Sequence, residues 1–237
     1  MTIDSVSYSG TAEASALFQG LDWDDGTTSL SLPDGIFLCT GQIPGLTNTM
    51  SNWSQEWDLP GDPDLTVLLN QFTYDASSLT ITFTADATID GLSFQFDFGS
   101  EEFPEYLGGV YNDAFGVFLD GVNIAYDTDS QPITINSTFL ALNNTPHWVP
   151  GTTSVDFPIE YDGLTLRLTT QTTITPGQHT LKFVIADGGD AKFDSGVFIA
   201  DLSFGLACIG TGVPPELDEI PENAVVHVGS VFELPLS

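Results

Sequence analysis

The chain has 237 residues, of which 41% are hydrophobic, and this suits a single domain with a sizeable core. Three Lys and Arg residues stand against 33 Asp and Glu residues, so the formal net charge is −30 at pH 7. This charge excludes nucleic acid as a partner and disfavours anionic membrane surfaces, because few cationic side chains are present to neutralise phosphates.

The N-terminal residues show neither the charged nor the apolar segment of a secretory leader. No run of about eighteen apolar residues occurs in the chain, so we expect no transmembrane segment. The missing leader leaves two interpretations, a cytoplasmic protein or a mature chain whose leader has been removed. We prefer the second, which predicts an extracellular or cell-surface location.

Alternating apolar and polar residues predict β-strands along most of the chain. The clearest runs are 79–84, 92–98 and 164–169, where Leu, Ile or Phe stands at every second position. Turn-forming dipeptides separate the strand runs, at Asp120-Gly121, Asp162-Gly163 and Pro176-Gly177.

Helix-forming composition is poor, and helix is expected for at most a turn or two around 63–70 and 101–107. Many short strands separated by such turns are typical of an all-β fold. The sequence therefore predicts a two-sheet antiparallel sandwich, jelly-roll-like, with little helix.

The composition changes once, near Gly210. Residues 1–209 are expected to form the sandwich domain, and residues 210–223 have the proline- and acid-rich composition of a linker. Residues 224–237 again show a strand pattern. This C-terminal strand either completes the domain's own sheet or is donated to a neighbouring subunit.

The chain holds two cysteines, Cys39 and Cys208. In an oxidising compartment they would form one disulfide that joins the two ends of the domain, and closing so long a loop contributes about 4–5 kcal/mol in the chain-entropy model. Two unrelated buried thiols are the alternative. Without nearby His, the pair does not form a zinc site.

Two Gly-rich acidic segments follow apolar strands and carry the strongest chemical signal, the first at 99–106 and 111–116 and the second at 186–190 and 193–196. Calcium binds six to eight oxygen ligands, which carboxylates and backbone carbonyls in such loops supply. A bound cation would also relieve repulsion between adjacent acids. We expect one calcium site that unites the two loops, whereas polar turn residues that cap strands are the alternative. The candidate metal ligands are Glu101, Glu102, Asp113, Asp187, Asp190 and Asp194.

Other candidate sites give weaker signals. Asp62-Pro63-Asp64 suits a helix cap better than a second cation site. Trp53, Trp57 and Trp148 are candidates for stacking against a sugar, although core positions are the alternative. No nucleophile–histidine arrangement appears, and paired carboxylates held in oxygen cages favour a metal over glycoside hydrolysis. We therefore expect no catalytic residues.

The sequence resembles the choice-of-anchor L domain family of secreted bacterial and archaeal surface proteins. Four blocks carry the resemblance between Leu17 and Leu206: GIFLCTG at 35–41, GDPDL at 61–65, SEEFPEY with YNDAFG at 100–106 and 111–116, and IADGGD with FDSGVF at 185–190 and 193–198. The resemblance implies secretion, surface display and varied C-terminal anchoring, with no known reaction. No sorting tail is recognisable after Gly210.

These features together predict an extracellular calcium-binding module with a structural or adhesive role. Its expected partners are other copies of itself, a surface protein or a glycan, and its C-terminal strand would serve self-assembly. A calcium-dependent carbohydrate-binding module is the alternative, and a glycan-active enzyme is a third reading.

Overall fold

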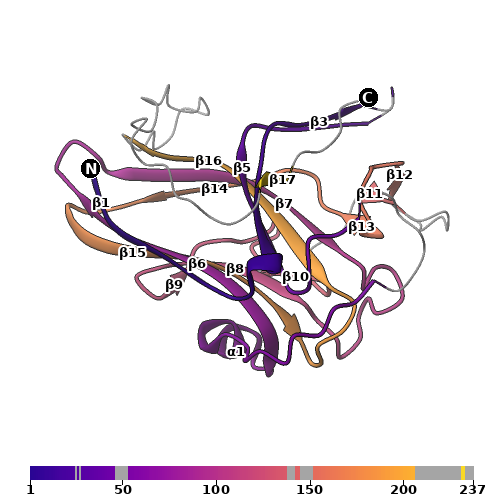
Figure 1. Ribbon diagram of the computed structural model, residues 1–237. Helices are drawn as coiled ribbons and strands as arrows, with labels where there is room; N and C mark the ends of the chain where they lie inside the picture. The colour runs from indigo at the N-terminus through magenta and orange to yellow at the C-terminus, as the bar shows by residue number, and fades with distance from the viewer. Residues whose placement is uncertain are drawn as a thin grey trace.

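The structure, a computed structural model, describes residues 1–24, 26, 28–45, 53–137, 142–144, 152–205 and 231–232. Two sheets of mostly antiparallel strands pack against each other, and one α-helix lies beside β6 (Thr73–Ala85) and β8 (Ala114–Leu119) (Figure 1). The predicted all-β sandwich with little helix is confirmed. No helix among these residues is long and apolar enough to span a membrane.

The first sheet is antiparallel throughout. Its strands follow in the order β1 (Thr2–Ser9), β6 (Thr73–Ala85), β15 (Gly177–Gly188), β8 (Ala114–Leu119) and β10 (Ile133–Thr134), and β9 (Val122–Asn123) also pairs with β8. The β8–β9 turn has Asp120 at φ 51° and Gly121 at φ 82°. Two successive positive φ angles are typical of a two-residue hairpin turn, so the Asp-Gly turn signal is confirmed.

The second sheet is larger and contains the central pair β7 and β16. Its order is β12 (Thr153–Ser154), β11 (Leu142–Asn143), β13 (Gly163–Leu164), β7 (Gly91–Ser100), β16 (Ser195–Gly205), β5 (Gly35–Cys39), β2 (Ser15–Phe18) and β17 (Val231–Phe232), with β14 (Leu168–Thr173) also paired to β7. The pairs β11–β12 and β2–β17 are parallel. A separate hairpin joins β3 (Leu21–Asp24) to β4 (Ser29–Leu32), and a 3-10 turn spans Ala12–Ala14.

The alternation in β6 and β7 builds the main core. Apolar side chains from both sheets form one buried cluster, whose members include Leu79, Ile81, Phe83, Phe94, Phe96 and Phe98. A second cluster contains Phe37, Tyr161 and Phe198. Phe198 and Phe37 come from β16 and β5, which also supply Val197 and Leu38 to the main core. Since successive strand residues face opposite sides, the second cluster covers the outer face of this sheet.

The expected continuous strand at 164–169 is wrong, because it is interrupted by a bulge. Leu164 pairs with Gly99 and Leu168 pairs with Phe96, so four steps on one strand oppose three on the other. An extra residue reverses the facing of the side chains that follow it. Leu166 is consequently 53% exposed, although the alternation predicted it to be buried.

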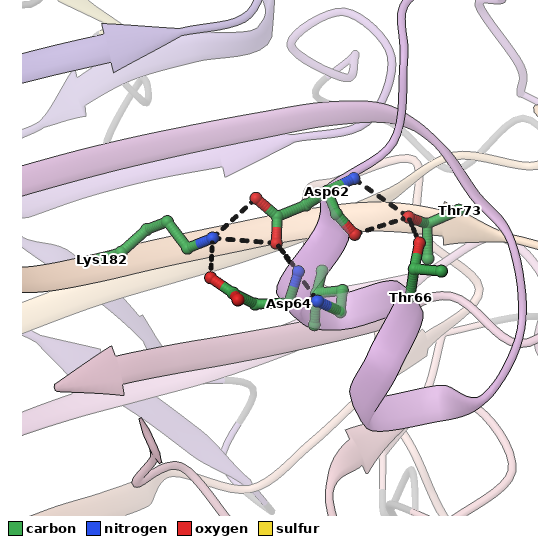
Figure 2. Close-up of polar contacts among 6 residues, drawn as sticks. Asp62, Asp64, Thr66, Thr73 and Lys182 are labelled. Atoms are coloured by element: carbon green, nitrogen blue, oxygen red, sulfur yellow. Dashed lines mark hydrogen bonds and ion pairs between the residues drawn. The ribbon is translucent and has the colours of Figure 1, made fainter. Parts of the chain in front are cut away.

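Helix α1 (Pro63–Leu69) begins at an acidic cap. Oδ1 of Asp62 accepts hydrogen bonds from the backbone N–H groups of Asp64 and Leu65. Figure 2 shows Lys182 of β15 between the two acids, with Nζ 2.7 Å from Asp62 Oδ2 and 2.5 Å from Asp64 Oδ2. The predicted cap is confirmed, and an ammonium group lies where a second cation had been considered. Residues 101–107 form turns instead of helix.

The C-terminal strand is described only at Val231–Phe232, which pairs with Leu17 and Phe18 of β2. The proposed linker at 210–223 lies outside the described residues. The domain boundaries therefore stay a prediction.

Candidate metal centre

The strand ends bring the acidic loops to one edge of the sandwich, which we call the acidic edge. Ser100 at the end of β7 pairs with Ser195 at the start of β16, and Ala186 near the end of β15 pairs with Ala114 at the start of β8. Antiparallel neighbours place the end of one strand beside the start of the next. Two loops lie at this edge, the β7–β8 loop (101–113) and the β15–β16 loop (189–194). The Ser195 hydroxyl at the end of the second loop donates to Asp113 at the end of the first, so the two loops lie close together, as the two-loop hypothesis requires.

Glu102, Asp113 and Asp187 form the inner group of this edge, and each is at most 1% exposed. Asp113 accepts hydrogen bonds from Ser195 Oγ at 2.6 Å and from the Gly188 N–H at 3.0 Å. Both carboxylate oxygens of Asp187, and Oε1 of Glu102, are buried without a hydrogen-bond partner. Because burying an unpaired charge is costly, this group needs protons or a cation.

The pKa values of the inner group reflect the same lack of a compensating charge. Burial, followed by the charge of Asp113, raises the pKa of Glu102 to about 9 and the pKa of Asp187 well above its ordinary value. Burial raises the pKa of Asp113 to about 7, although hydrogen bonds from Ser195 and Gly188 oppose the shift. A nearby cation would reverse these shifts by favouring the ionised carboxylates.

Glu101 and Asp194 lie beside the inner group and contact each other through the backbone, since the Glu101 N–H donates to the Asp194 carbonyl at 3.1 Å. They are 4% and 0% exposed. Oε2 of Glu101 is buried without a partner. Burial raises the pKa of Glu101 to about 9 and that of Asp194 to about 8.

Residues 53–59, which form neither helix nor strand, cross the acidic edge, and we call this segment the strap. Its alternate backbone N–H groups donate to buried carboxylates: Trp53 to Glu101 at 3.1 Å, Gln55 to Asp194 at 2.9 Å, and Trp57 and Leu59 to Asp75 at 2.9 and 2.6 Å. Alternate amides of an extended chain face one side, which accounts for Trp53, Gln55 and Trp57, whereas Asp58 departs from extended backbone at φ 55° before the Leu59 amide. The strap therefore fastens loops that are remote in sequence.

Asp75 is a member of this edge that the sequence did not indicate. It is 1% exposed, has φ 45°, and its charge raises the pKa of both Asp187 and Asp194. Burial raises its own pKa, although the two strap amides oppose the shift. Its position inside the β6 strand pattern concealed it, because an isolated acid in a strand normally faces solvent.

Asp190, the remaining predicted ligand, is only half-buried at the rim of the edge. Its charge still raises the pKa of Glu102 and Asp113. The structure thus brings five of the six predicted ligands into buried positions near one another and leaves Asp190 nearer to solvent.

The donor set suits a hard cation, because it consists of oxygen atoms. Among the described residues, no three His, Cys, Asp or Glu side chains are already arranged as a metal site. Cation binding would therefore require side-chain rotation that turns the unpaired oxygens of Asp187 and Glu102 toward one point. The oxygen ligands and the burial of these residues suit calcium, but their side chains would have to rotate before they could coordinate it.

The other predicted site residues have different outcomes. Cys39 is a buried thiol with Sγ 3.4 Å from the Gly41 carbonyl oxygen, and burial raises the pKa of this thiol. Cys208 lies outside the described residues, so the disulfide stays a prediction. Trp53 and Trp57 are half-buried with their indole nitrogens enclosed, and their role in sugar stacking stays a prediction. Trp148 also lies outside the described residues.

A different aromatic cluster lies at this edge and was missed. The ring of Tyr106 is 5.4 Å from that of Tyr111 and 5.0 Å from that of Phe193, and all three side chains are half-buried. Phe193 has φ 59°, which is rare for an aromatic residue. These rings lie within the acidic loop motifs, which sequence reasoning examined only for their carboxylates.

Comparison with known proteins gives one family and one distant structure. No curated protein matches the chain. A solved structure described as CBM51 from Clostridium perfringens GH95 in complex with methyl-galactose is 15% identical, covers 85% of this chain and 93% of its own, and has a TM-score of 0.33, a value too low to support any inference. The model of the choice-of-anchor L domain matches residues 1–205. This chain therefore belongs to the choice-of-anchor L domain family.

Proposed function

We propose that this domain is an extracellular, non-catalytic surface module that binds calcium at the acidic edge and has a structural or adhesive role. Family membership supports surface display, and the net charge of −30 supports a requirement for cations. The observation that carries the calcium proposal is Asp187, which is 0% exposed and lies beside Asp113, with no hydrogen bond of normal geometry at either carboxylate oxygen and only the nearby Thr40 hydroxyl to oppose the rise of its pKa.

The proposed mechanism is a coupling of loop order to calcium. Without the cation, the carboxylates of the inner group repel one another and oppose close packing of the two acidic loops. Calcium cancels this repulsion and stabilises the folded state by mass action. A calcium-rich exterior would thus stabilise the module after export.

The test is the thermal midpoint in excess calcium, in excess chelator and in magnesium. At about 100 times Kd, calcium should stabilise the fold by about 2.7 kcal/mol, which corresponds to about 5–10 °C for a chain of this size. Asp187→Asn should abolish most of this shift, whereas the exposed Asp129→Asn should preserve it. An equal midpoint in calcium and chelator would rule out the calcium proposal.

Self-assembly through the C-terminal strand is part of the same proposal. The pairing of Val231–Phe232 with β2 supports β2 as the acceptor, because β2 would otherwise be a sheet edge. A Leu17→Cys/Val231→Cys variant, with the native cysteines replaced by Ser, should form disulfide-linked oligomers if the strand is exchanged between copies. Only intramolecular crosslinks would assign the strand to its own sheet.

Glycan binding is a second candidate, and the cluster of Tyr106, Tyr111 and Phe193 beside the acidic edge favours it. Aromatic faces stack on sugar rings, and a bound cation could position hydroxyl groups nearby. Binding on a glycan array that disappears with chelator and with Tyr106→Ala would support this function. Turnover of a polysaccharide that Glu102→Gln abolishes without unfolding would contradict the non-catalytic assignment.

A further inference from the structure

We propose that His179 is a pH-dependent clasp. As an imidazolium it joins the β8–β9 turn to the segment between β14 and β15, and loss of one proton breaks one of its two contacts and lets these turns separate. The clasp lies at the start of β15, whereas the acidic edge lies at the end of the same strand. The proposal therefore concerns a part of the molecule that is remote from the proposed calcium site.

Both nitrogens of the His179 ring face atoms that accept hydrogen bonds. Nδ1 lies 2.7 Å from Oδ2 of Asp120, in the β8–β9 turn, and Nε2 lies 2.7 Å from the backbone carbonyl oxygen of Thr175, between β14 and β15. A carbonyl oxygen has no proton to donate, and neither has an ionised carboxylate. A neutral imidazole donates from one nitrogen and would direct the lone pair of the other at an acceptor. Two donors are needed, and only the imidazolium form supplies them.

The second proton of this contact resides on the ring and not on Asp120. Oδ1 of Asp120 accepts the Thr180 N–H at 2.8 Å, and the Asp120 side chain is 50% exposed, so its ionised form is both hydrogen-bonded and hydrated. Burial alone would raise the pKa of Asp120, but the hydrogen bonds from His179 and from the Thr180 N–H lower it. The pair is therefore an imidazolium and a carboxylate.

The ring is enclosed, so water has little access to replace a lost contact. His179 is 8% exposed, and its ring lies 5.5 Å from that of Phe83, its partner residue on β6. Leu181, two residues further along the same face of β15, belongs to the main core. A buried polar atom that loses its partner costs more free energy than an exposed one. Deprotonation should therefore displace a turn instead of leaving an unpaired ring nitrogen in place.

Asp120 is the charged group in contact with the ring, within the part of the chain that the structure describes. Three further acids lie on neighbouring segments: Asp4 of β1, and Asp86 and Asp90 between β6 and β7. Asp4 accepts from Gln178, which precedes His179 and faces the opposite side of the sheet. Asp86 binds the ammonium group of Met1, and the Asp90 carbonyl accepts the Ile174 N–H. The clasp thus depends on the pair of His179 and Asp120.

The pH dependence of the clasp has a definite sign. The hydrogen bond to Asp120, supported by the Thr175 carbonyl, raises the pKa of His179 above its ordinary value of about 6.5, although burial opposes the shift. The folded state therefore retains the proton more strongly than the unfolded chain. The resulting contribution to stability is complete below about pH 6.5 and disappears as pH rises through the folded value. The clasp is closed in acidic solution and released in alkaline solution.

The first test is the protonation state of His179, measured by proton–nitrogen NMR of the imidazole. At about pH 6 both ring nitrogens should carry a proton, and the titration midpoint should lie above that of an unfolded histidine. Asp120→Asn should lower this midpoint because it removes the carboxylate, whereas the exposed Asp129→Asn should leave it unchanged. A single protonated nitrogen at about pH 6, or equal midpoints in the two variants, would overturn the proposal.

The second test is hydrogen exchange of the Thr180 N–H, which reports whether the turns separate. After correction for the intrinsic effect of pH, exchange should accelerate at least tenfold between about pH 6 and about pH 9, as expected when a hydrogen bond between charged groups is lost. His179→Gln cannot change its charge, so it should lose this acceleration, and Asp129→Asn should retain it.

The variants also distinguish the clasp from a general loss of stability in alkaline solution. Equal acceleration in His179→Gln and in the unmodified chain would assign the effect to other groups and contradict the clasp, as would no acceleration in either. If His179→Gln does not fold, as judged by circular dichroism, Asp120→Asn replaces it, because its amide oxygen still accepts the Thr180 N–H while the charge is removed. The NMR titration of the unmodified chain gives an answer in either case.

Discussion

At the scale of single residues, Asp97 shows that an acid at a polar position of an alternating strand can still be buried. It is 2% exposed, and neither carboxylate oxygen has a hydrogen-bond partner. Its cross-strand neighbour is Phe198, a member of the apolar cluster on the outer face of the sheet. Burial raises the pKa of Asp97 to about 7, and the charge of Arg167 opposes the shift only in part.

Asp97 should make the protein less stable as pH rises from about 4 to above 7. Its folded pKa lies above the unfolded value, so the folded state binds more protons across this window and loses stability as the carboxyl ionises. Asp97→Asn should therefore raise the thermal midpoint by at least about 2 °C at pH 8 and by less than half as much at pH 5. Thermal unfolding with chelator at both pH values checks this, and an equal change at both would contradict it.

The sequence predicted which acids lie close together where side-chain chemistry and local motif agreed, and their role as metal ligands stays a prediction. Glu101, Glu102, Asp113, Asp187 and Asp194 follow or precede apolar strands inside Gly-rich loops, and the fold brings them together. Asp75, Asp97 and Asp162 could not be identified in the same way, because their burial depends on segments remote in sequence. Asp162 in particular was interpreted only as part of a turn, whereas the neighbouring Gly163 begins a strand.

At the scale of elements, the strap is the feature that fastens the acidic edge. Its four donating amides reach Glu101, Asp194 and Asp75, which come from three different parts of the chain. A hydrogen bond to a charged acceptor is worth about 1.5–3 kcal/mol, roughly twice a neutral one. The strap therefore contributes to both the stability of the edge and the positions of its carboxylates.

Removing one strap amide should loosen the edge selectively. Gln55→Pro deletes the N–H that donates to Asp194 and should lower the free energy of unfolding by about 1–3 kcal/mol. Glu56→Pro is the matched control, because the intervening amide faces away from the carboxylates, and its cost should be clearly smaller. Denaturant unfolding measures both. Equal costs would mean that proline strain, not the lost hydrogen bond, determines the effect.

The strands were largely predictable, whereas the strap was not. Period-two runs identified β6 and β7, and the Asp-Gly signal identified the β8–β9 turn. The strap acts through backbone amides, which every residue except proline supplies, so no side-chain pattern indicates it. The bulge between β13 and β14 was also unpredictable, because it depends on the register against β7.

At the scale of the whole molecule, the charge balance distinguishes general repulsion from local repulsion. The 33 acids and three basic residues produce repulsion over the entire surface, which any salt can screen. The buried acids of the edge experience a different repulsion, because mobile ions cannot approach a site from which solvent is excluded. Only protons or a cation that enters the site can neutralise the buried acids.

These two forms of repulsion should respond separately to salt and to calcium. With chelator, raising NaCl from about 0.1 to about 1 M shortens the Debye length from about 10 to about 3 Å, so the thermal midpoint should rise gradually. Calcium at matched ionic strength should add a shift that saturates as its site fills. Glu102→Gln/Asp187→Asn should keep the gradual response to NaCl and lose most of the saturable response to calcium. If NaCl alone reproduced the full effect of calcium, surface screening would account for the stabilisation, and the buried carboxylates would be neutralised by protons.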